Sequence, residues 1–217
     1  MAEKSKTASR PRGRIPSNEL AKHEEALLRA AAGLFLQHGF VRVSIGRIAR
    51  AARVSTKTIY ARFGGKSGLF TAVVRRELAP RLAIQTMLAE NPSHDPISML
   101  KDVSIEYLSR MLEPSSLSLQ RMAIGEATQM PEIAKIYYAE AYASSFERLA
   151  QWMQVQLQAG RMKFGPPHEA SQFLAGLVCA GVIDRALLLN EIPSTEAQIA
   201  HVERAIDIFS RYYILNQ

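Results

Sequence analysis

The 217-residue sequence predicts an all-α protein made of two helical domains. Apolar residues recur at spacings of three and four along almost the whole chain after residue 18, which is the period of an amphipathic helix. No stretch alternates apolar and polar residues as a half-buried strand would. The breaks between the helical patterns fall at glycines and prolines, which commonly end helices. We therefore expect a short N-terminal group of helices followed by a longer C-terminal group.

The first 18 residues are rich in Lys, Arg, Ser and Pro and contain little apolar surface to bury, so we expect a disordered basic arm. Arg10, Arg12 and Arg14 alternate with small or turn residues, and such an arm suits phosphates or an adjacent minor groove. The alternative is a tail that only raises solubility. Residues 19–38 then have the spacing of an amphipathic helix, and Gly39 is placed to end it.

Two short helical patterns meet at a tight corner between Ser44 and Phe70. The first pattern has a narrow apolar stripe flanked by arginines, and the stripe is formed by Ile45, Ile48, Ala49 and Ala52. Ser55 is a favourable N-cap residue, so a second helix should begin at about Thr56. Gly64 and Gly65 are placed to end it. Two helices joined in this way form a helix-turn-helix.

The second helix of this pair has one apolar face, because Ile59 and Phe63 lie four residues apart. Its other faces are mainly hydroxyls, cations and a phenol, contributed by Thr56, Lys57, Thr58, Tyr60, Ala61 and Arg62. Groups of this kind bind phosphates and reach base edges in a major groove wide enough to admit a helix. A longer helix then runs from Lys66 towards Leu78, and its cationic start suits a phosphate contact.

The same stretch resembles the DNA-binding domain of the TetR family of transcriptional regulators, over about fifty residues from His23 to Val74. The matching positions are Gly39, Phe40, Ser44, Ile48, Ala49, Ala52, Val54, Ser55, Thr58, Tyr60, Phe63, Lys66, Leu69 and Phe70. The resemblance implies binding to a palindromic operator in double-stranded DNA, with Tyr60 and Lys66 on phosphates. The candidate DNA-binding residues are Ser44, Ser55, Thr56, Lys57, Thr58, Tyr60, Ala61, Arg62 and Lys66.

Arg53 departs from the family pattern, which most often has a glycine in the turn between the two helices. A residue other than glycine costs on the order of 1 kcal/mol at positive φ. Two outcomes are open: either the turn accommodates the arginine in that conformation, or the geometry of the turn differs in this chain.

The distribution of charge sets the N-terminal third apart from the rest of the chain. Residues 1–81 contain 17 Lys and Arg against 5 Asp and Glu, whereas the remainder contains 10 against 15. A basic region of this kind is expected where one part of a chain faces a polyanion.

Several other kinds of chemistry are not indicated. The single cysteine, Cys179, excludes an intramolecular disulfide and fits a reducing cytoplasm. The five histidines are scattered and have no metal-ligand spacing, so we expect neither a metal site nor a cofactor. No apolar run is long enough to span a membrane, and no signal peptide is evident. We find no nucleophile elbow or phosphate loop, and therefore expect no enzyme.

Five further helices are expected after a loop at residues 90–96, over residues 97–112, 116–130, 132–158, 168–189 and 195–215. The helix over 168–189 is the most apolar and contains Gly176 and Gly181, for which close approach of another helix would compensate. The last two helices present much apolar surface and predict self-association into a homodimer. Outward-facing candidates are Leu177, Ile183, Leu187, Val202, Ile206 and Phe209.

Methionines and aromatic residues of the C-terminal two thirds either fill the core or line an apolar pocket, since ligand cavities are mostly apolar. The candidate ligand-binding residues are Met111, Met122, Tyr142, Phe146, Trp152, Met153 and Phe173. A weaker resemblance, beginning at Gln120, is to the ligand domain of a TetR subgroup tied to efflux and stress regulation. It implies a small apolar or amphipathic effector.

These observations predict a basic arm over 1–18, a helix-turn-helix DNA-binding domain over 19–80, and a helical ligand-binding and dimerisation domain over 81–217. We expect a cytoplasmic repressor that a ligand releases from its operator. Two rival hypotheses are a helical small-molecule-binding enzyme or carrier, and a protein that coats nucleic acid without regard to sequence.

Overall fold

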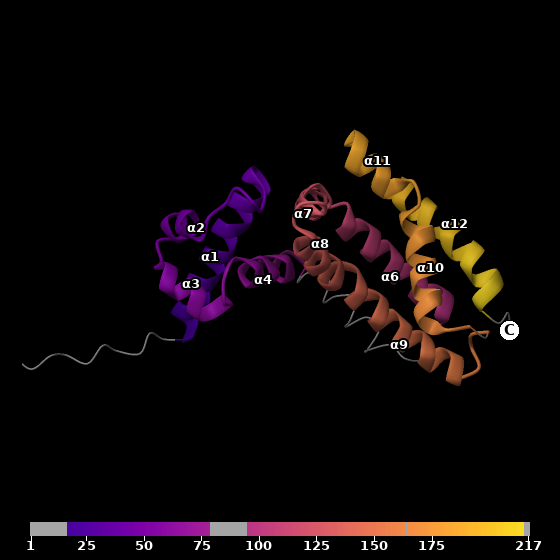
Figure 1. Ribbon diagram of the computed structural model, residues 1–217. Coiled ribbons are helices and arrows are strands. Elements are labelled where there is room, and N and C mark those ends of the chain that lie inside the picture. The colour runs from indigo at the N-terminus through magenta and orange to yellow at the C-terminus, as the bar shows by residue number, and fades with distance from the viewer. Residues whose placement is uncertain (1–16, 79–94, 164, 215–217) are drawn as a thin grey trace, which may run out of the picture.

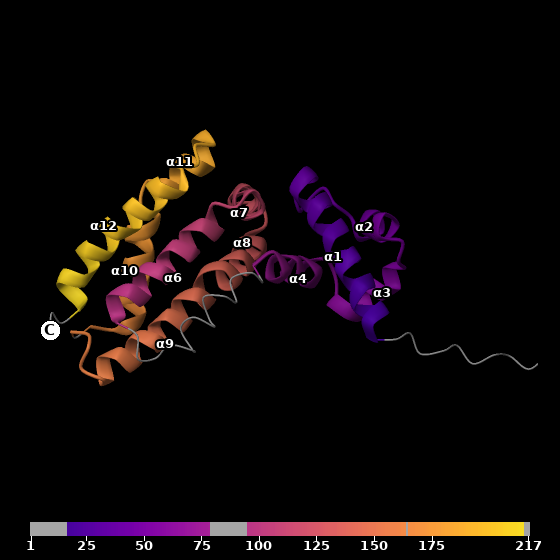
Figure 2. The same cartoon turned by 180° about the vertical axis from the view of Figure 1, so that it is seen from behind.

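The computed structural model describes residues 17–78, 95–163 and 165–214, and all of its named elements in these ranges are helices. The basic arm, the loop at residues 90–96 and Pro80 therefore lie wholly or largely outside the described residues. The N-terminal helices form one group, and α4 runs from it to the C-terminal helices (Figure 1). The same arrangement is seen from behind in Figure 2. An all-α fold is confirmed.

The N-terminal group consists of α1 (Ser17–His38), α2 (Ile45–Ala52), α3 (Thr56–Phe63) and α4 (Lys66–Leu78). Its core is centred on three phenylalanines, Phe35, Phe40 and Phe70, whose ring centroids lie 5.5 to 5.7 Å apart. Ile48 of α2 and Ile59 of α3 are fully buried against this core. The apolar stripes of the sequence thus determine how α2 and α3 are held.

The C-terminal group begins with α6 (Pro96–Met111) and α7 (Pro114–Glu126). Asp95 caps α6 by accepting a hydrogen bond from the Ser98 N–H at 2.9 Å. The helix expected over 116–130 is shorter than predicted, because α7 already ends at Glu126. Met130 has a non-helical backbone (φ −134°, ψ 71°) before Pro131, which disfavours helical backbone in the preceding residue.

The helix expected over 132–158 is a continuous helical segment, but its middle part is π-helical rather than α-helical. It consists of α8 (Pro131–Tyr138), a π-helical segment η2 (Ala139–Ala143) and α9 (Ser144–Gln158). A π-helix accommodates an extra residue in the turn, which spacing in the sequence does not reveal.

The helix expected over 168–189 is divided into α10 (Pro167–Cys179) and α11 (Val182–Leu189), which are bent by 53°. Gly181 lies at the break with φ 70°, so its role is conformational. A Cβ at Gly176 or Gly181 would meet no atom within 4 Å, and the predicted close helix approach is therefore wrong for the described residues. The final helix is α12 (Thr195–Tyr213).

The described C-terminal helices correct part of the predicted dimer surface. Val202, Ile206, Phe209 and Ile183 are between 0 and 6% exposed and belong to the core of their own chain. The exposed apolar side chains of these helices are instead Phe173, Leu188, Leu189, Ile208 and Tyr212. The error has a simple cause: spacing identifies the apolar stripe of a helix but not the neighbour that covers it.

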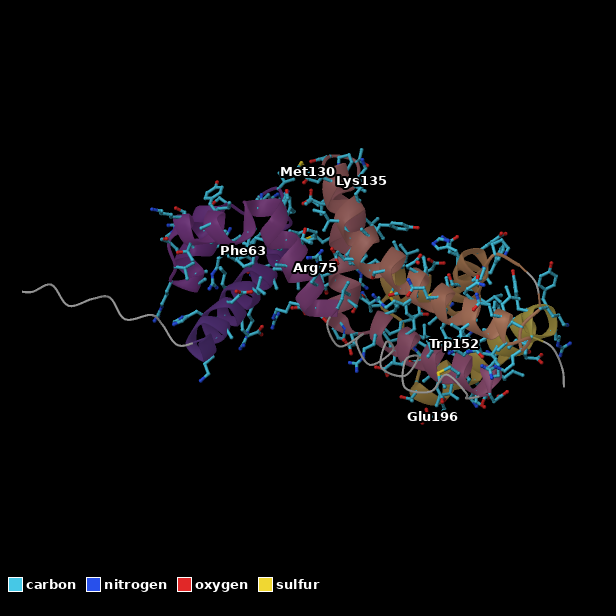
Figure 3. The ribbon with its side chains drawn as sticks, turned by 90° about the horizontal axis from the view of Figure 1, so that it is seen from below. Phe63, Arg75, Met130, Lys135, Trp152 and Glu196 are labelled. Carbon is cyan, nitrogen blue, oxygen red and sulfur yellow. The ribbon has the colours of Figure 1, made fainter. Side chains whose placement is uncertain are left out.

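The two groups of helices are joined by shared packing. Leu119 and Ala123 of α7 and Tyr137 of α8 belong to the same buried cluster as the three phenylalanines. Arg75 of α4 lies at the junction in Figure 3 and donates to a Glu140 carboxylate oxygen of η2 at 2.7 Å. The N-terminal core is thus completed by residues from the C-terminal half.

No single helix among the described residues is long and apolar enough to span a membrane. The α10 and α11 pair reaches the required length and apolar composition only when taken together across its bend. Leu174 and Val178 of α10 are packed into the protein core.

Candidate DNA-binding surface and apolar cavity

The turn between α2 and α3 is fixed by capping at both helix starts. Ser44 accepts a hydrogen bond from the Arg47 N–H at 3.2 Å, and Ser55 accepts one from the Thr58 N–H at 3.0 Å. The Ser55 and Thr58 hydroxyls are also 2.8 Å apart. Three of the predicted DNA-binding residues therefore stabilise the helix-turn-helix itself, since a cap of this kind contributes about 1 kcal/mol.

The turn accommodates Arg53 in the positive-φ conformation, which was one of the two outcomes left open by the sequence. Arg53 lies in the left-handed region at φ 55° and ψ 39° and ends α2 as its C-cap. Its N–H donates to the Arg50 carbonyl at 3.2 Å, while the Val54 N–H donates to the Ala49 carbonyl at 3.0 Å. The turn keeps the conformation typical of glycine, and the arginine adopts it at a conformational cost.

The predicted recognition face of α3 is open to solvent. Thr56, Lys57 and Ala61 are exposed, and 57% of the Tyr60 surface is accessible. Ile59, on the opposite side of α3, is fully buried. Lys57 has no hydrogen-bond or ion-pair partner among the described residues. This face can approach a duplex without first breaking contacts within the protein.

Arg62 and Lys66, by contrast, already have partners within the protein. Arg62 forms an ion pair with Glu24 of α1 at 2.9 Å. Lys66 lies 4.3 Å from the centre of the Phe40 ring and donates to the Val41 carbonyl at 3.2 Å. Burial lowers the pKa of Lys66, and the nearby Glu126 carboxylate partly opposes that shift. Any phosphate contact of these two side chains adds to an existing structural role.

Two further cations of the helix-turn-helix were not among the predicted DNA contacts. Arg50 and Arg53 are exposed and have no side-chain partner among the described residues. The signal was present in the sequence, because residues 26–76 contain no Asp or Glu to neutralise them. These two exposed arginines add further positive charge to the helix-turn-helix.

A small cavity of about 40 Å³ lies between three helices of the C-terminal group. The lining residues are Val103, Ser104 and Tyr107 from α6, Ser145, Phe146 and Leu149 from α9, and Leu174, Ala175 and Val178 from α10. This is far below the roughly 300 to 1,000 Å³ typical of ligand pockets, so an effector would enter only if the lining side chains moved. The described lining is largely apolar and contains no Asp, Glu, Lys, Arg or His.

Of the predicted ligand-binding residues, Phe146 lines this cavity. Met111, Trp152 and Met153 are buried in the C-terminal core and are not among the residues that line this cavity. Phe173 is 54% exposed and lies outside this cavity, in a groove between α10 and α12.

Tyr142 and Met122 lie elsewhere. The Tyr142 ring is 6.2 Å from that of Phe146, and its hydroxyl accepts a hydrogen bond from Gln120 at 2.6 Å. Met122 lines a separate, polar groove between α7 and the end of α1. Helical spacing alone cannot distinguish these positions, because it does not show which helices enclose a void.

The described residues contain no group of three or more His, Cys, Asp or Glu side chains that could hold a metal ion. The geometry instead defines a class of protein: a helix-turn-helix with a free, basic outer face, joined through a shared core to a helical domain with an apolar cavity. This is the organisation of a one-component DNA-binding regulator.

Comparison with known proteins identifies the family. Residues 27–73 match the family model of bacterial regulatory proteins of the tetR family. Residues 98–214 match that of the C-terminal domain of AefR-like transcriptional repressors. The chain therefore belongs to the TetR family of transcriptional regulators.

Individual relatives agree with this assignment. The chain is 29% identical over 102 residues to the probable acrEF/envCD operon repressor of Escherichia coli K12, an alignment covering 46% of each protein. The chain thus matches about half the length of that curated relative. A TetR-family regulator from Mesorhizobium loti MAFF303099 superimposes with a TM-score of 0.78 at 21% identity, covering 90% of this chain and 98% of that one. The flavonoid-responsive regulator FrrA gives 0.73 at 25%, covering 91% and 100%.

Proposed function

We propose that this protein is a cytoplasmic, dimeric repressor that occupies a palindromic operator and leaves it when a small apolar or amphipathic molecule binds. Residues 19–80 would read DNA, residues 81–217 would bind the effector and pair the subunits, and residues 1–18 would add contacts to the duplex. The main support is the exposed face of α3, where Lys57 and Tyr60 stand free on a helix that is capped and held by a buried Ile59. No catalytic or cofactor-dependent role is part of this proposal.

The family assignment supports regulation as the function. Both family models describe regulatory proteins, and the matching relative in E. coli is named as an operon repressor. We extend repression to this chain as a proposal, since that relative is matched over only 46% of its length. The operator sequence and the regulated genes are to be identified by experiment.

A path of contacts could carry a signal from the cavity to the DNA-binding helices. Phe146 lines the cavity, and its ring is 6.2 Å from Tyr142, which is 5.9 Å from Tyr137 in the N-terminal core. The segment η2 between these residues also holds Arg75 of α4 through Glu140. A ligand that displaces Phe146 would act on α4 through this segment, provided that it binds the two arrangements with different affinity.

We place the dimer interface on the outer faces of α10 and α12. A groove between these helices is lined by Phe173, Leu177, Ile208 and Tyr212, of which three are more than half exposed. Exposed aromatic and aliphatic side chains of this size are enriched where subunits meet. Two-fold pairing would also match the symmetry of a palindromic operator.

Competition binding tests the proposal against its rivals. The labelled duplex is one recovered by selection from random sequences, and the competitor is unlabelled genomic DNA. A regulator should keep its site in a large excess of bulk DNA, because specific binding is typically about 10³ to 10⁷ tighter than non-specific binding. A protein that coats nucleic acid would lose the label in proportion to competitor, and an enzyme or carrier would bind neither DNA.

A further inference from the structure

The turn between α1 and α2 is tied to the C-terminal group by a contact that the path through α4 does not include. Val41 lies in this turn, and its side chain is 49% exposed. Its N–H donates to a Glu126 carboxylate oxygen at 3.3 Å, and its carbonyl accepts a hydrogen bond from Lys66 at 3.2 Å. Both backbone groups of one residue are thus held, one by α7 and the other by the start of α4.

Glu126 is the last residue of α7, and its carboxylate approaches the turn closely. A Cβ built at Gly39 would lie only 2.9 Å from the Glu126 Oε1 atom, and Gly39 also has a positive φ of 76°. The carboxylate is near enough to Lys66 to oppose the lowering of the Lys66 pKa by burial. Glycine at position 39 therefore gives the carboxylate room beside the backbone of the turn.

The Glu126 contact spans a polar groove rather than a tightly packed interface. The groove has a volume of about 560 Å³ and lies between the end of α1, the turn and α7. Gly39, Val41 and Glu126 are among its lining residues, whereas Phe40 is buried in the N-terminal core. Loss of the hydrogen bond to Val41 should therefore leave that core intact.

The contact also fixes the direction of the Lys66 side chain. A lysine ammonium carries three donors at the end of a flexible four-carbon stem. One donor is used by the Val41 carbonyl, and the ammonium lies 4.3 Å from the centre of the Phe40 ring, which leaves further donors for a phosphate. A side chain that is already ordered loses less conformational freedom on binding, so it binds more tightly.

We propose that Glu126 is a positioning residue for DNA binding, which holds Val41 so that the Val41 carbonyl keeps Lys66 directed at a phosphate of the duplex. The proposal rests on the DNA-binding function inferred above and adds a residue of the C-terminal domain to it. It also predicts an effect opposite in sign to simple electrostatics. Removing an acidic residue close to a polyanion normally strengthens binding, whereas removing Glu126 should weaken it.

Anisotropy titrations with the full chain test this inference on the selected operator duplex and on a scrambled duplex, at several salt concentrations. Glu126→Ala should weaken binding to both by about three- to tenfold, the effect of one hydrogen bond. It should also lower the slope of log affinity against log salt towards that of Lys66→Ala. Glu126→Gln keeps an acceptor oxygen without the charge and should stay within about twofold of the wild type.

Two controls separate positioning from a general structural role. Adding Glu126→Ala to Lys66→Ala should cause no further loss of affinity, because Glu126 acts through Lys66. Glu132→Ala removes an exposed acidic side chain of α8 that has no ion-pair partner among the described residues, and it should not weaken binding. Circular dichroism should show that every variant keeps its helices.

The inference is overturned if Glu126→Ala binds DNA as tightly as the wild type or more tightly, or if the Ala and Gln variants behave alike. It is also overturned if the losses of Glu126→Ala and Lys66→Ala add, or if Lys66→Ala keeps the wild-type salt slope. The scrambled duplex needs no operator, so the expected pattern without any palindrome would refute only the proposed repressor. A recovered palindrome that Glu126→Ala binds normally would refute only the positioning role.

Discussion

At the scale of single residues, Arg53 shows how a local rule and the fold compete. The sequence predicts a conformational free-energy cost if Arg53 adopts a positive φ. The structure shows that it does: φ is 55° at a position that usually has glycine. The surrounding turn is over-determined, because Ser44 and Ser55 cap both helices and Ile48 and Ile59 are fully buried. A chain held this firmly can keep an unfavourable backbone conformation.

Arg53→Gly should therefore raise the free energy of unfolding, by about 0.5 to 1 kcal/mol after the greater freedom of the unfolded glycine is subtracted. Urea denaturation followed by circular dichroism measures the change. Arg50→Gly, three positions earlier within α2, is the matched control and should lower stability by about 1 kcal/mol. A loss of stability in both variants would show that Arg53 is not strained.

Variants of two lysines at the DNA-binding surface should distinguish a base contact, which reads sequence, from a phosphate contact, which positions the protein on the duplex. Lys57 is exposed and free of partners among the described residues, so Lys57→Ala should cost about 1 to 3 kcal/mol at the preferred site and little elsewhere. Lys66→Ala should weaken all duplexes alike and reduce the slope of log affinity against log salt by about one.

Anisotropy titrations on specific and scrambled duplexes at several salt concentrations measure both effects. Tyr60→Phe should resemble the Lys66 variant in weakening all sequences equally. The assignment of Lys66 fails if its variant loses thermal stability but keeps the wild-type salt slope, because its bond to Val41 would then be its whole role. An equal loss on both duplexes would make Lys57 a phosphate contact.

At the scale of helices, the sequence was most informative where cap and stripe agree. The bounds of α2 and α3 follow from Ser44, Ser55 and Gly64, each of which has its expected conformation. The bend at Gly181 and the π-helical segment η2 were not predicted. Both interrupt an apolar pattern without changing its composition, and only the packing of neighbouring helices decides where such a pattern bends.

The ion pair that ties α1 to α4 should make stability depend on acid. Arg76 donates to both carboxylate oxygens of Glu25, and this hydrogen bonding lowers the pKa of Glu25 below its ordinary value of 4.5. A carboxyl with a lowered folded pKa stabilises the protein above pH 4.5, and the contribution is lost as the pH falls below that value. Because Glu25 is half exposed, we expect less than about 1 kcal/mol.

Glu25→Gln should therefore lower the free energy of unfolding at neutral pH and make its decline in acid shallower. Urea denaturation at a series of pH values between neutral and strongly acidic measures both. The control is Glu132→Gln, an exposed residue of α8 with no ion-pair partner among the described residues. The same acid dependence in wild type and Glu25→Gln would mean that the Arg76 contact does not stabilise α1 against α4.

At the scale of the whole molecule, the functional surface of the N-terminal half could be predicted from the sequence more completely than that of the C-terminal half. In the N-terminal third, caps, glycines and charges converge on one surface. In the C-terminal part, the sequence suggested seven ligand-binding residues, and of these Phe146 lines the described cavity. A void depends on three helices meeting imperfectly, and no one helix carries a signal for that in its own spacing.

The dimer should be disrupted by charge on the outer faces of α10 and α12. Ile208 and Tyr212 are 57 and 64% exposed, so Ile208→Glu with Tyr212→Lys should give a folded monomer that binds its operator poorly. Sedimentation velocity and circular dichroism check the mass and the fold. Ile124→Glu, at a similarly exposed position on α7, should remain dimeric.

Ile206 and Phe209, which the sequence predicts to face outward, are unsuitable for such charges, because they are core residues whose replacement by charge would unfold the domain. A wild type that sediments as a monomer at micromolar concentration would contradict the dimer. A double variant that stays dimeric and binds DNA normally would place the interface elsewhere.

The most direct test of the central claim is selection of bound sequences from random duplexes by the purified full-length chain. A two-fold regulator that reads DNA with α3 should enrich one palindrome whose half-sites lie about 34 Å apart or a multiple of it, and Lys57→Ala should relax the preference within each half-site. Recovery of sequences with no shared motif would contradict the claim that this chain is a sequence-specific regulator. So would recovery of a motif that the Lys57→Ala and Tyr60→Phe variants bind as tightly as the wild type does.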